Sequence, residues 1–171
     1  VMVMGAHYVL TASIHENVVS NWNWIEALIA SVPIAILVML IVWINQFQDA
    51  PSDAAVGKNT WVVRTAEKGE WMKLEKPLRL YKQFMVEAFV AVALVGALSF
   101  FTDFGTVYAF MGLIPLALVW KAFKMADEWM IKWNNPNADR QKVPYELLLV
   151  NVSTIGIHFI TGILLAVAYI L

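Results

Sequence analysis

The chain has 171 residues, of which 60% are hydrophobic and 15% charged, and its formal net charge is −1. Soluble domains are typically about 45–50% apolar and about 25% charged, so this composition excludes an ordinary soluble domain and indicates an integral membrane protein. The near-neutral charge argues against a nucleic-acid partner, and the absence of cysteine excludes disulfides and thiolate metal sites.

Apolar runs along the chain predict an all-α fold, a polytopic bundle of transmembrane helices in a single membrane domain spanning residues 1–171. The runs are 1–14, 24–44, 84–101, 106–123 and 147–171, which predict about five crossings of the lipid bilayer. A helix needs about 20 residues to cross, so the first run is short. That short run, and a first residue other than methionine, lead us to expect the C-terminal part of a longer chain.

The basic residues predict the orientation of these helices. All twelve Lys and Arg lie between residues 58 and 82 or between 121 and 142, whereas the connections 15–23 and 102–105 have none. Because Lys and Arg accumulate in cytoplasmic loops, both basic segments are expected in the cytoplasm and the C-terminus outside. We therefore interpret 45–83 as a cytoplasmic Asp-rich loop with a cap, and 124–146 as a second cytoplasmic loop.

Two carboxylates follow the second apolar run. Asp49 and Asp53 are four residues apart, so in a helix they lie one turn apart on the same face. Two such groups repel each other unless a cation lies between them, and Mg²⁺ binds one or two carboxylates while water and phosphate oxygens fill its other positions. The pair is thus predicted as a Mg²⁺ site that binds a lipid diphosphate and is catalytic.

The residues around this pair carry a family resemblance. The pattern runs Asn45-xxx-Asp49-xxx-Asp53-xxx-Gly57-Lys58-Asn-Thr60-xxx-Arg64. It resembles the second Asp-rich motif of the UbiA superfamily of intramembrane aromatic prenyltransferases. The nearest branch is the 1,4-dihydroxy-2-naphthoate polyprenyltransferases, with weaker matches at 5–11, 31–33 and 151–158. The chain departs from that branch at Trp61 and at 65–66.

The resemblance covers nearly the whole chain and implies the second half of a nine-helix fold. It implies Mg²⁺-dependent transfer of a prenyl group from a polyprenyl diphosphate to an aromatic acceptor, as in menaquinone or related quinone synthesis in a prokaryotic cell membrane. The first Asp-rich motif of the family, NxxxDxxxD, is not present in these residues. We therefore expect that a missing N-terminal half or a partner chain carries it.

Several other residues receive roles from this resemblance. Lys58 is expected to bind phosphate as a point charge and Arg64 to bind it in a bidentate manner. Asn45, one turn before Asp49, is expected to contact the diphosphate, to bind the metal or to orient Asp49. Polar residues inside apolar runs are candidates for the substrate cavity, although such groups also serve as helix–helix contacts. These candidates are Tyr8, Thr11 and Asn151.

Two other classes of protein are alternatives to this interpretation. The CDP-alcohol phosphotransferases also end their motif in DxxxD, but they carry an Asp-Gly-xx-Ala-Arg run upstream that residues 42–48 do not match. A non-catalytic UbiA-like membrane subunit of a larger complex fits the same residues as the enzyme does. The tryptophans near the ends of the apolar runs are interpreted as an aromatic belt at the membrane surface.

Overall fold

The computed structural model describes residues 24–171 except 68 and 70. In this part of the chain the elements are helices, and four segments are long and apolar enough to cross a membrane. The helices are α3 (Trp24–Ala55), α4 (Trp61–Thr65), α5 (Glu75–Leu98), η1 (Val107–Leu113), α6 (Leu116–Trp133), η2 (Val143–Leu147) and α7 (Leu148–Ala168). The prediction of an all-α membrane bundle is confirmed, and the run 1–14 lies outside the described residues.

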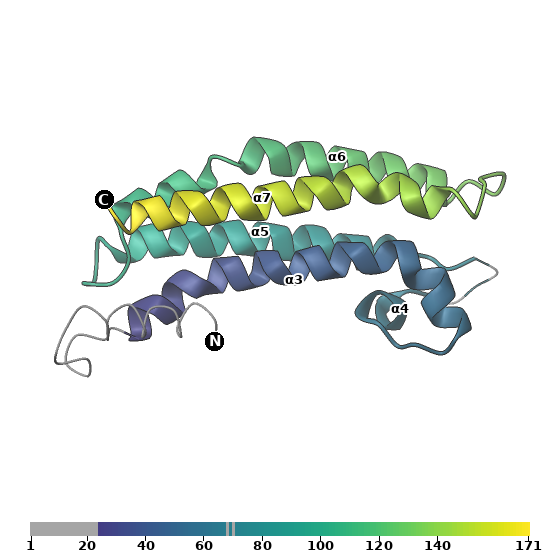
Figure 1. Ribbon diagram of the computed structural model, residues 1–171, viewed down its shortest axis with the longest axis horizontal. Coiled ribbons are helices and arrows are strands. Elements are labelled where there is room, and N and C mark those ends of the chain that lie inside the picture. The colour runs from purple at the N-terminus through teal and green to yellow at the C-terminus, as the bar shows by residue number, and fades with distance from the viewer. Residues whose placement is uncertain (1–23, 68, 70) are drawn as a thin grey trace.

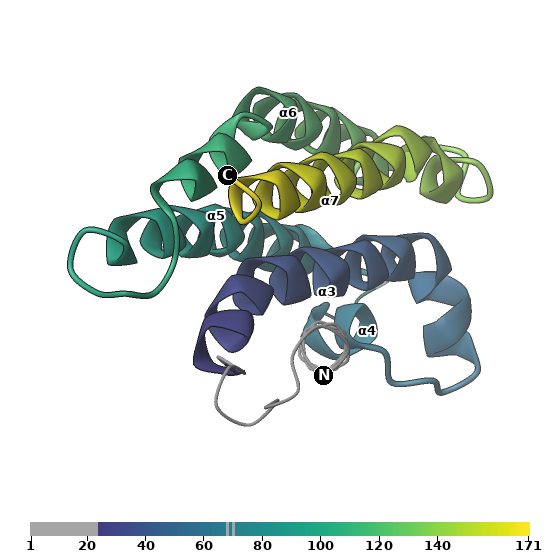
Figure 2. The same cartoon turned by 60° about the vertical axis from the view of Figure 1, so that its left-hand side comes forward.

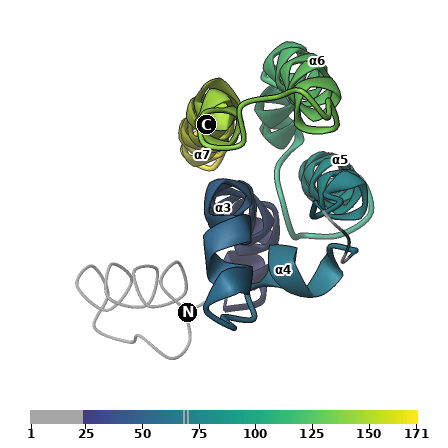
Figure 3. The same ribbon diagram turned by 90° about the vertical axis from the view of Figure 1, so that its right-hand side faces the viewer.

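The four long helices run side by side in alternating directions (Figures 1 and 2). Helix α3 packs against α5 and α7, α6 packs against α7, and η1 contacts both α5 and α7. Figure 3 looks along the bundle and shows α4 beside α3 and α5. We call the end where α3 and α6 finish and α5 and α7 begin the basic end, and the opposite end the far end.

Three helices extend further at the basic end than the apolar runs predicted. Helix α3 continues to Ala55, α5 starts at Glu75 and α6 continues to Trp133. Residues 45–55, 75–83 and 124–133, interpreted as loops, are therefore helical. The physical reason is amphipathicity, because each extension keeps one buried face at helical spacing while its charged residues, apart from Asp53, lie outside that face. On α6, for example, Ala126 and Trp133 are buried and Lys132 is exposed.

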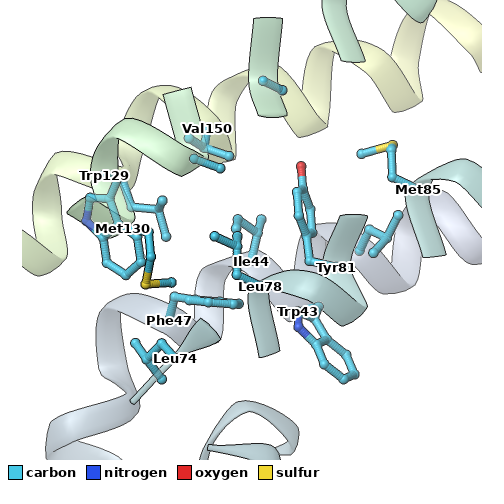
Figure 4. Close-up of a cluster of buried hydrophobic side chains, with 14 of the residues drawn as sticks. Trp43, Ile44, Phe47, Leu74, Leu78, Tyr81, Met85, Trp129, Met130 and Val150 are labelled. Carbon is cyan, nitrogen blue, oxygen red and sulfur yellow. The ribbon is translucent and has the colours of Figure 1, made fainter. Parts of the chain in front are cut away.

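The extensions are held together by a core at the basic end, formed by side chains of α3, α5 and α6 (Figure 4). We call it the basic-end core; it includes Phe47, Leu78, Trp129, Met130 and Trp133. The rings of Phe47 and Trp129 meet edge to face, with centroids 6.0 Å apart. Burial of such large side chains contributes much of the stability of a helix pair, so the bundle continues beyond the apolar runs as a packed unit.

Three tryptophans expected in an aromatic belt belong instead to the interior. Trp43, Trp129 and Trp133 are all buried. Their indole N–H groups donate to the backbone carbonyl oxygens of Pro77, Val143 and Met72, at 3.2, 2.7 and 2.8 Å. A buried indole requires such an acceptor, and backbone carbonyl groups at the starts of α5 and η2 and in the connection before α5 provide it. Trp61 and Trp120 are exposed, as residues of a belt are expected to be.

Arg140 fixes the connection between α6 and α7 on the basic end. Its guanidinium lies 4.3 Å from the centroid of the Trp71 ring and donates a hydrogen bond of 2.6 Å to the carbonyl oxygen of Trp133. The Trp71 and Trp133 rings are 4.6 Å apart. The cation–π contact and the helix-terminal hydrogen bond thus join two connections that are far apart in the sequence.

Candidate functional site

The two aspartates lie on the last turns of α3, where this helix bends toward α4 (Figure 1). The helix contains Pro51 between them, and a proline inside a helix removes one backbone hydrogen bond and favours a bend. Asp49 is exposed and Asp53 is 8% exposed. In the part of the chain that the structure describes, the carboxylate of Asp49 has no ion pair or hydrogen bond.

Gly57 ends α3 and turns the chain back along it. Its φ is +73°, a left-handed conformation that favours glycine. The N–H of Lys58 donates to the carbonyl oxygen of Asp53 at 2.8 Å, and the N–H of Gly57 donates to that of Ala54 at 3.2 Å. This pair of hydrogen bonds is the Schellman motif. It gives the Gly-Lys part of the sequence pattern a structural role as a helix cap.

The cap places the ammonium of Lys58 on the carboxylate of Asp53. The distance from Nζ to Oδ1 is 3.1 Å, and the side chain of Lys58 is 63% exposed while that of Asp53 is 11% exposed. Lys58 therefore supplies the positive charge next to this aspartate. Because the lysine is mostly in solvent, its ion pair with Asp53 contributes little to the free energy of folding, and its side chain is free to move.

Helix α4 is anchored to α3 by a residue that the sequence analysis did not select. The Oε1 atom of Gln46 accepts a hydrogen bond of 3.2 Å from the N–H of Val62, and the side chain of Thr60 caps the same helix. Arg64 follows at the end of α4 and is exposed, with no ion pair among the described residues. The structure thus places Arg64 on a helix that packs against α3 but does not join it to Asp49 or Asp53.

The structure brings together two of the predicted site residues, Asn45 and Asn151. The Nδ2 atom of Asn151 on α7 donates to Oδ1 of Asn45 on α3 at 2.8 Å, across 106 residues of sequence. Asn151 is 4% exposed and Asn45 is exposed. This contact has the form of a helix–helix hydrogen bond in a membrane. It also fixes the side chain that precedes Asp49 by one turn.

A second polar contact joins α7 to α5 one turn deeper. The hydroxyl of Thr154 donates to the carbonyl oxygen of Val150 at 2.8 Å, so it accepts from the hydroxyl of Tyr81 at 2.7 Å. Both side chains are buried. The remaining candidates for a substrate cavity, Tyr8 and Thr11, lie outside the described residues.

The oxygen atoms of the candidate site suit a Mg²⁺ ion only if a bound ligand fills the remaining coordination positions of the ion. Among the described residues there is no group of three or more His, Cys, Asp and Glu side chains able to hold a metal. Asp49, Asp53 and Asn45 offer hard oxygen atoms, and Mg²⁺ is commonly bound by one or two carboxylates together with water and phosphate oxygens. The chemistry of these side chains therefore fits an ion shared with a diphosphate and does not fit a closed metal cage.

Comparisons with known proteins found no relative of this chain. No family model, no curated protein and no solved structure matches the chain. The resemblance to the UbiA superfamily consequently stays a prediction, carried by the pattern between Asn45 and Arg64.

Proposed function

We propose that the chain contributes the Asp-rich part of a Mg²⁺-dependent prenyltransferase site, which transfers a prenyl group from a polyprenyl diphosphate to an aromatic acceptor. The observation that carries this proposal is the grouping of Asp49, Asp53 and Lys58 at the end of a membrane-spanning helix. Acidic groups for a metal and a cation for phosphate then lie beside a lipid phase that accommodates a long apolar chain.

Each residue of this group has a defined task in the proposed reaction. When bound, Mg²⁺ neutralises the charge that develops on the leaving diphosphate. Asp49 and Asp53 would hold the metal and, through it, the diphosphate, and Asn45 would orient Asp49 from one turn away. Lys58 leaves Asp53 and donates to a phosphate oxygen, a movement that its exposure permits.

A single carboxylate pair is not sufficient for this reaction. A diphosphate carries up to about three negative charges, whereas one or two carboxylates bind roughly one Mg²⁺. The acidic residues that the structure describes in the other connections at the basic end are paired with lysines, as in Glu146 with Lys132 and Asp139 with Lys142. The proposed enzyme therefore needs a second acidic cluster, supplied by an N-terminal half or by a partner chain.

A non-catalytic membrane subunit is the second candidate, and two contacts favour it. Lys58 already neutralises Asp53, and Asn151 already satisfies Asn45. Both contacts pair these side chains within the protein itself, as contacts with a purely structural role do. The two candidates differ in one measurable property, which is Mg²⁺-dependent binding of a prenyl diphosphate.

Binding of an unreactive prenyl thiolodiphosphate to the purified chain distinguishes them. We expect saturable binding that requires Mg²⁺ and is weakened about ten-fold or more by Asp49→Asn, because the amide keeps the shape but loses the charge that holds the metal. Glu128→Gln removes an exposed acid from α6 at the same end and should change binding less than two-fold. Binding that is independent of Mg²⁺, or absent, would favour the subunit.

The proposed enzyme has its basic end in the cytoplasm of a prokaryotic cell, where prenyl diphosphates are made. A reporter fused after Leu171 should then behave as exported, and one inserted after Ala138, in the connection from α6 to α7, as cytoplasmic. The physical ground is that residues 83–120 and 143–171 contain no Lys or Arg. Cytoplasmic behaviour of the reporter after Leu171 would reverse the orientation.

A further inference from the structure

A cavity lies at the basic end, between the last turns of α3 and the connection from α6 to α7; we call it the connection cavity. Its volume is about 640 Å³, within the usual range of ligand sites, about 300–1,000 Å³. Its polar lining residues are Gln48, Ser52, Arg140, Gln141, Lys142 and Tyr145. Gln48 is 24 residues beyond Trp24, about 36 Å along α3, so the cavity is remote from the far end, where residues 1–23 join the described part of the chain.

The charged side chains that line the connection cavity are both basic. Nζ of Lys142 lies 3.6 Å from Oδ2 of Asp139, and the lysine side chain is 81% exposed. Such an exposed pair contributes little free energy, so the ammonium is able to turn to another anion. Arg140 is held in place by the ring of Trp71 and the carbonyl oxygen of Trp133. The wall therefore combines one fixed and one movable positive charge.

The height of the connection cavity suits the phosphate of a lipid. Gln48 is four residues beyond Ile44, where the apolar run of α3 ends, about 6 Å along the helix. Tyr145 is two residues before Leu147, where the last apolar run begins, about 4 Å at the rise of a 3₁₀ helix. Both positions are just outside the apolar runs, where the polar groups of a bilayer lie.

An exposed apolar stripe on α7 begins next to Tyr145. Leu148, Leu149 and Val152 follow this tyrosine by three, four and seven residues, and helical spacing places them on one face. All four side chains are more than half exposed. An acyl chain whose headgroup is in the connection cavity is able to lie along this stripe, whereas a water-soluble phosphate gains nothing from it.

We infer that the connection cavity binds an anionic phospholipid, with its phosphate at Lys142 and Arg140 and an acyl chain along the stripe from Leu148 to Val152. Basic pockets between membrane helices bind acidic lipid headgroups in this way. Charge-assisted hydrogen bonds to phosphate oxygens are the contacts expected from both basic side chains. A zwitterionic lipid would bring its own ammonium group to these positive charges and is therefore disfavoured. The inference uses neither Asp49 nor Mg²⁺, so it does not rest on the proposed function.

Native mass spectrometry of the purified full chain in the presence of EDTA, with dioleoyl phosphatidylglycerol or dioleoyl phosphatidylcholine as the probe, tests the inference. We expect one molecule of phosphatidylglycerol to be retained, at least five-fold more than phosphatidylcholine. Lys142→Gln should weaken retention about five-fold, equivalent to the contribution of about 1 kcal/mol from one basic side chain near a membrane surface. Gln141→Glu should remove the preference, because it adds a negative charge to the wall.

Lys73→Gln and Asn135→Asp are the matched controls, because neither residue lines the connection cavity. Lys73 is also an exposed lysine with a long ion pair, 3.8 Å from Glu67. Asn135 is exposed and belongs to the same connection as Gln141. Each control should change retention less than two-fold. Equal losses in Lys73→Gln and Lys142→Gln would contradict the location, as would full retention by Lys142→Gln.

Three further outcomes would overturn the assignment of the occupant. Equal retention of the two phospholipids would contradict recognition of charge. Retention of phosphatidylglycerol that requires Mg²⁺ in place of EDTA, or that Asp49→Asn abolishes, would make the cavity part of the metal site. Failure of the prenyl thiolodiphosphate to bind would contradict the proposed function and leave the result with phosphatidylglycerol unchanged.

Discussion

Replacing Asp53 with alanine is expected to lower the rate of prenyl transfer by the proposed enzyme about 1,000-fold. Metal stabilisation of a leaving group contributes several kcal/mol, and each 1.36 kcal/mol changes the rate ten-fold. A loss of about 4 kcal/mol therefore gives about three orders of magnitude. The measurement is the initial rate with saturating Mg²⁺ and a labelled polyprenyl diphosphate.

Two asparagine variants separate loss of the metal ligand from loss of a helix-end contact. Asp53→Asn keeps the shape of the side chain but not its charge, so it should be nearly as slow as Asp53→Ala. Asp139→Asn changes another aspartate of the basic end that pairs with a lysine, Lys142 at 3.6 Å, and should stay within two-fold of the natural rate. Full activity in Asp53→Asn would refute the metal role, and an equal loss in Asp139→Asn would point to the overall charge of this end.

The largest effect on stability is expected for Trp133→Ala. Trp133 is fully buried, contacts the rings of Trp71 and Trp129, and donates to the carbonyl oxygen of Met72. Truncation of a buried aromatic side chain costs about 3–5 kcal/mol, and it also leaves that carbonyl oxygen without its donor. The free energy of unfolding, measured by denaturant titration in detergent micelles, should fall by about that amount.

Trp120→Ala is the control for this variant. Trp120 belongs to the same helix but is 66% exposed, and its only ring contact among the described residues is with Lys124. The expected cost is below about 1 kcal/mol. Trp133→Phe keeps a ring but removes the N–H donor, so its loss in the free energy of unfolding should lie between those of Trp133→Ala and Trp120→Ala. Similar losses for Trp133→Ala and Trp120→Ala would show that the basic-end core does not stabilise the bundle as argued.

The sequence predicted which segments cross the membrane better than where their helices end. A crossing requires a continuous apolar run, which is visible in any sequence. Beyond the run only one face must stay apolar, as on α3 after Ile44, where Phe47 and Ala50 are buried and Asn45 and Asp49 are exposed. A prediction from continuous apolar runs therefore ends the helix at the first such polar residue, whereas the helix itself continues.

Within the candidate site, local spacing was predictable and long-range contacts were not. Asp49 and Asp53 do lie one turn apart on a helix, as their spacing indicated. The hydrogen bond between Asn45 and Asn151 joins residues 106 positions apart, and no local pattern encodes such a pairing. Gln46 gave no signal either, because a glutamine near a helix end is usually a solvated side chain.

The extension of α3 past its apolar run also sets the height of Asp49 and Asp53 above the hydrocarbon core of the membrane. Asp49 is five residues and Asp53 nine residues beyond Ile44, about 8 Å and about 13 Å along the helix. The headgroup layer of one leaflet is about 5–7 Å thick, so Asp49 lies near its outer boundary and Asp53 lies a few Å beyond it. A lipid-anchored diphosphate carries its charge at a similar height and would arrive by lateral diffusion within the leaflet. Such a ligand reaches the site by diffusion in two dimensions. The effective concentration of the ligand is therefore set by the area of the membrane and not by the volume of the cell.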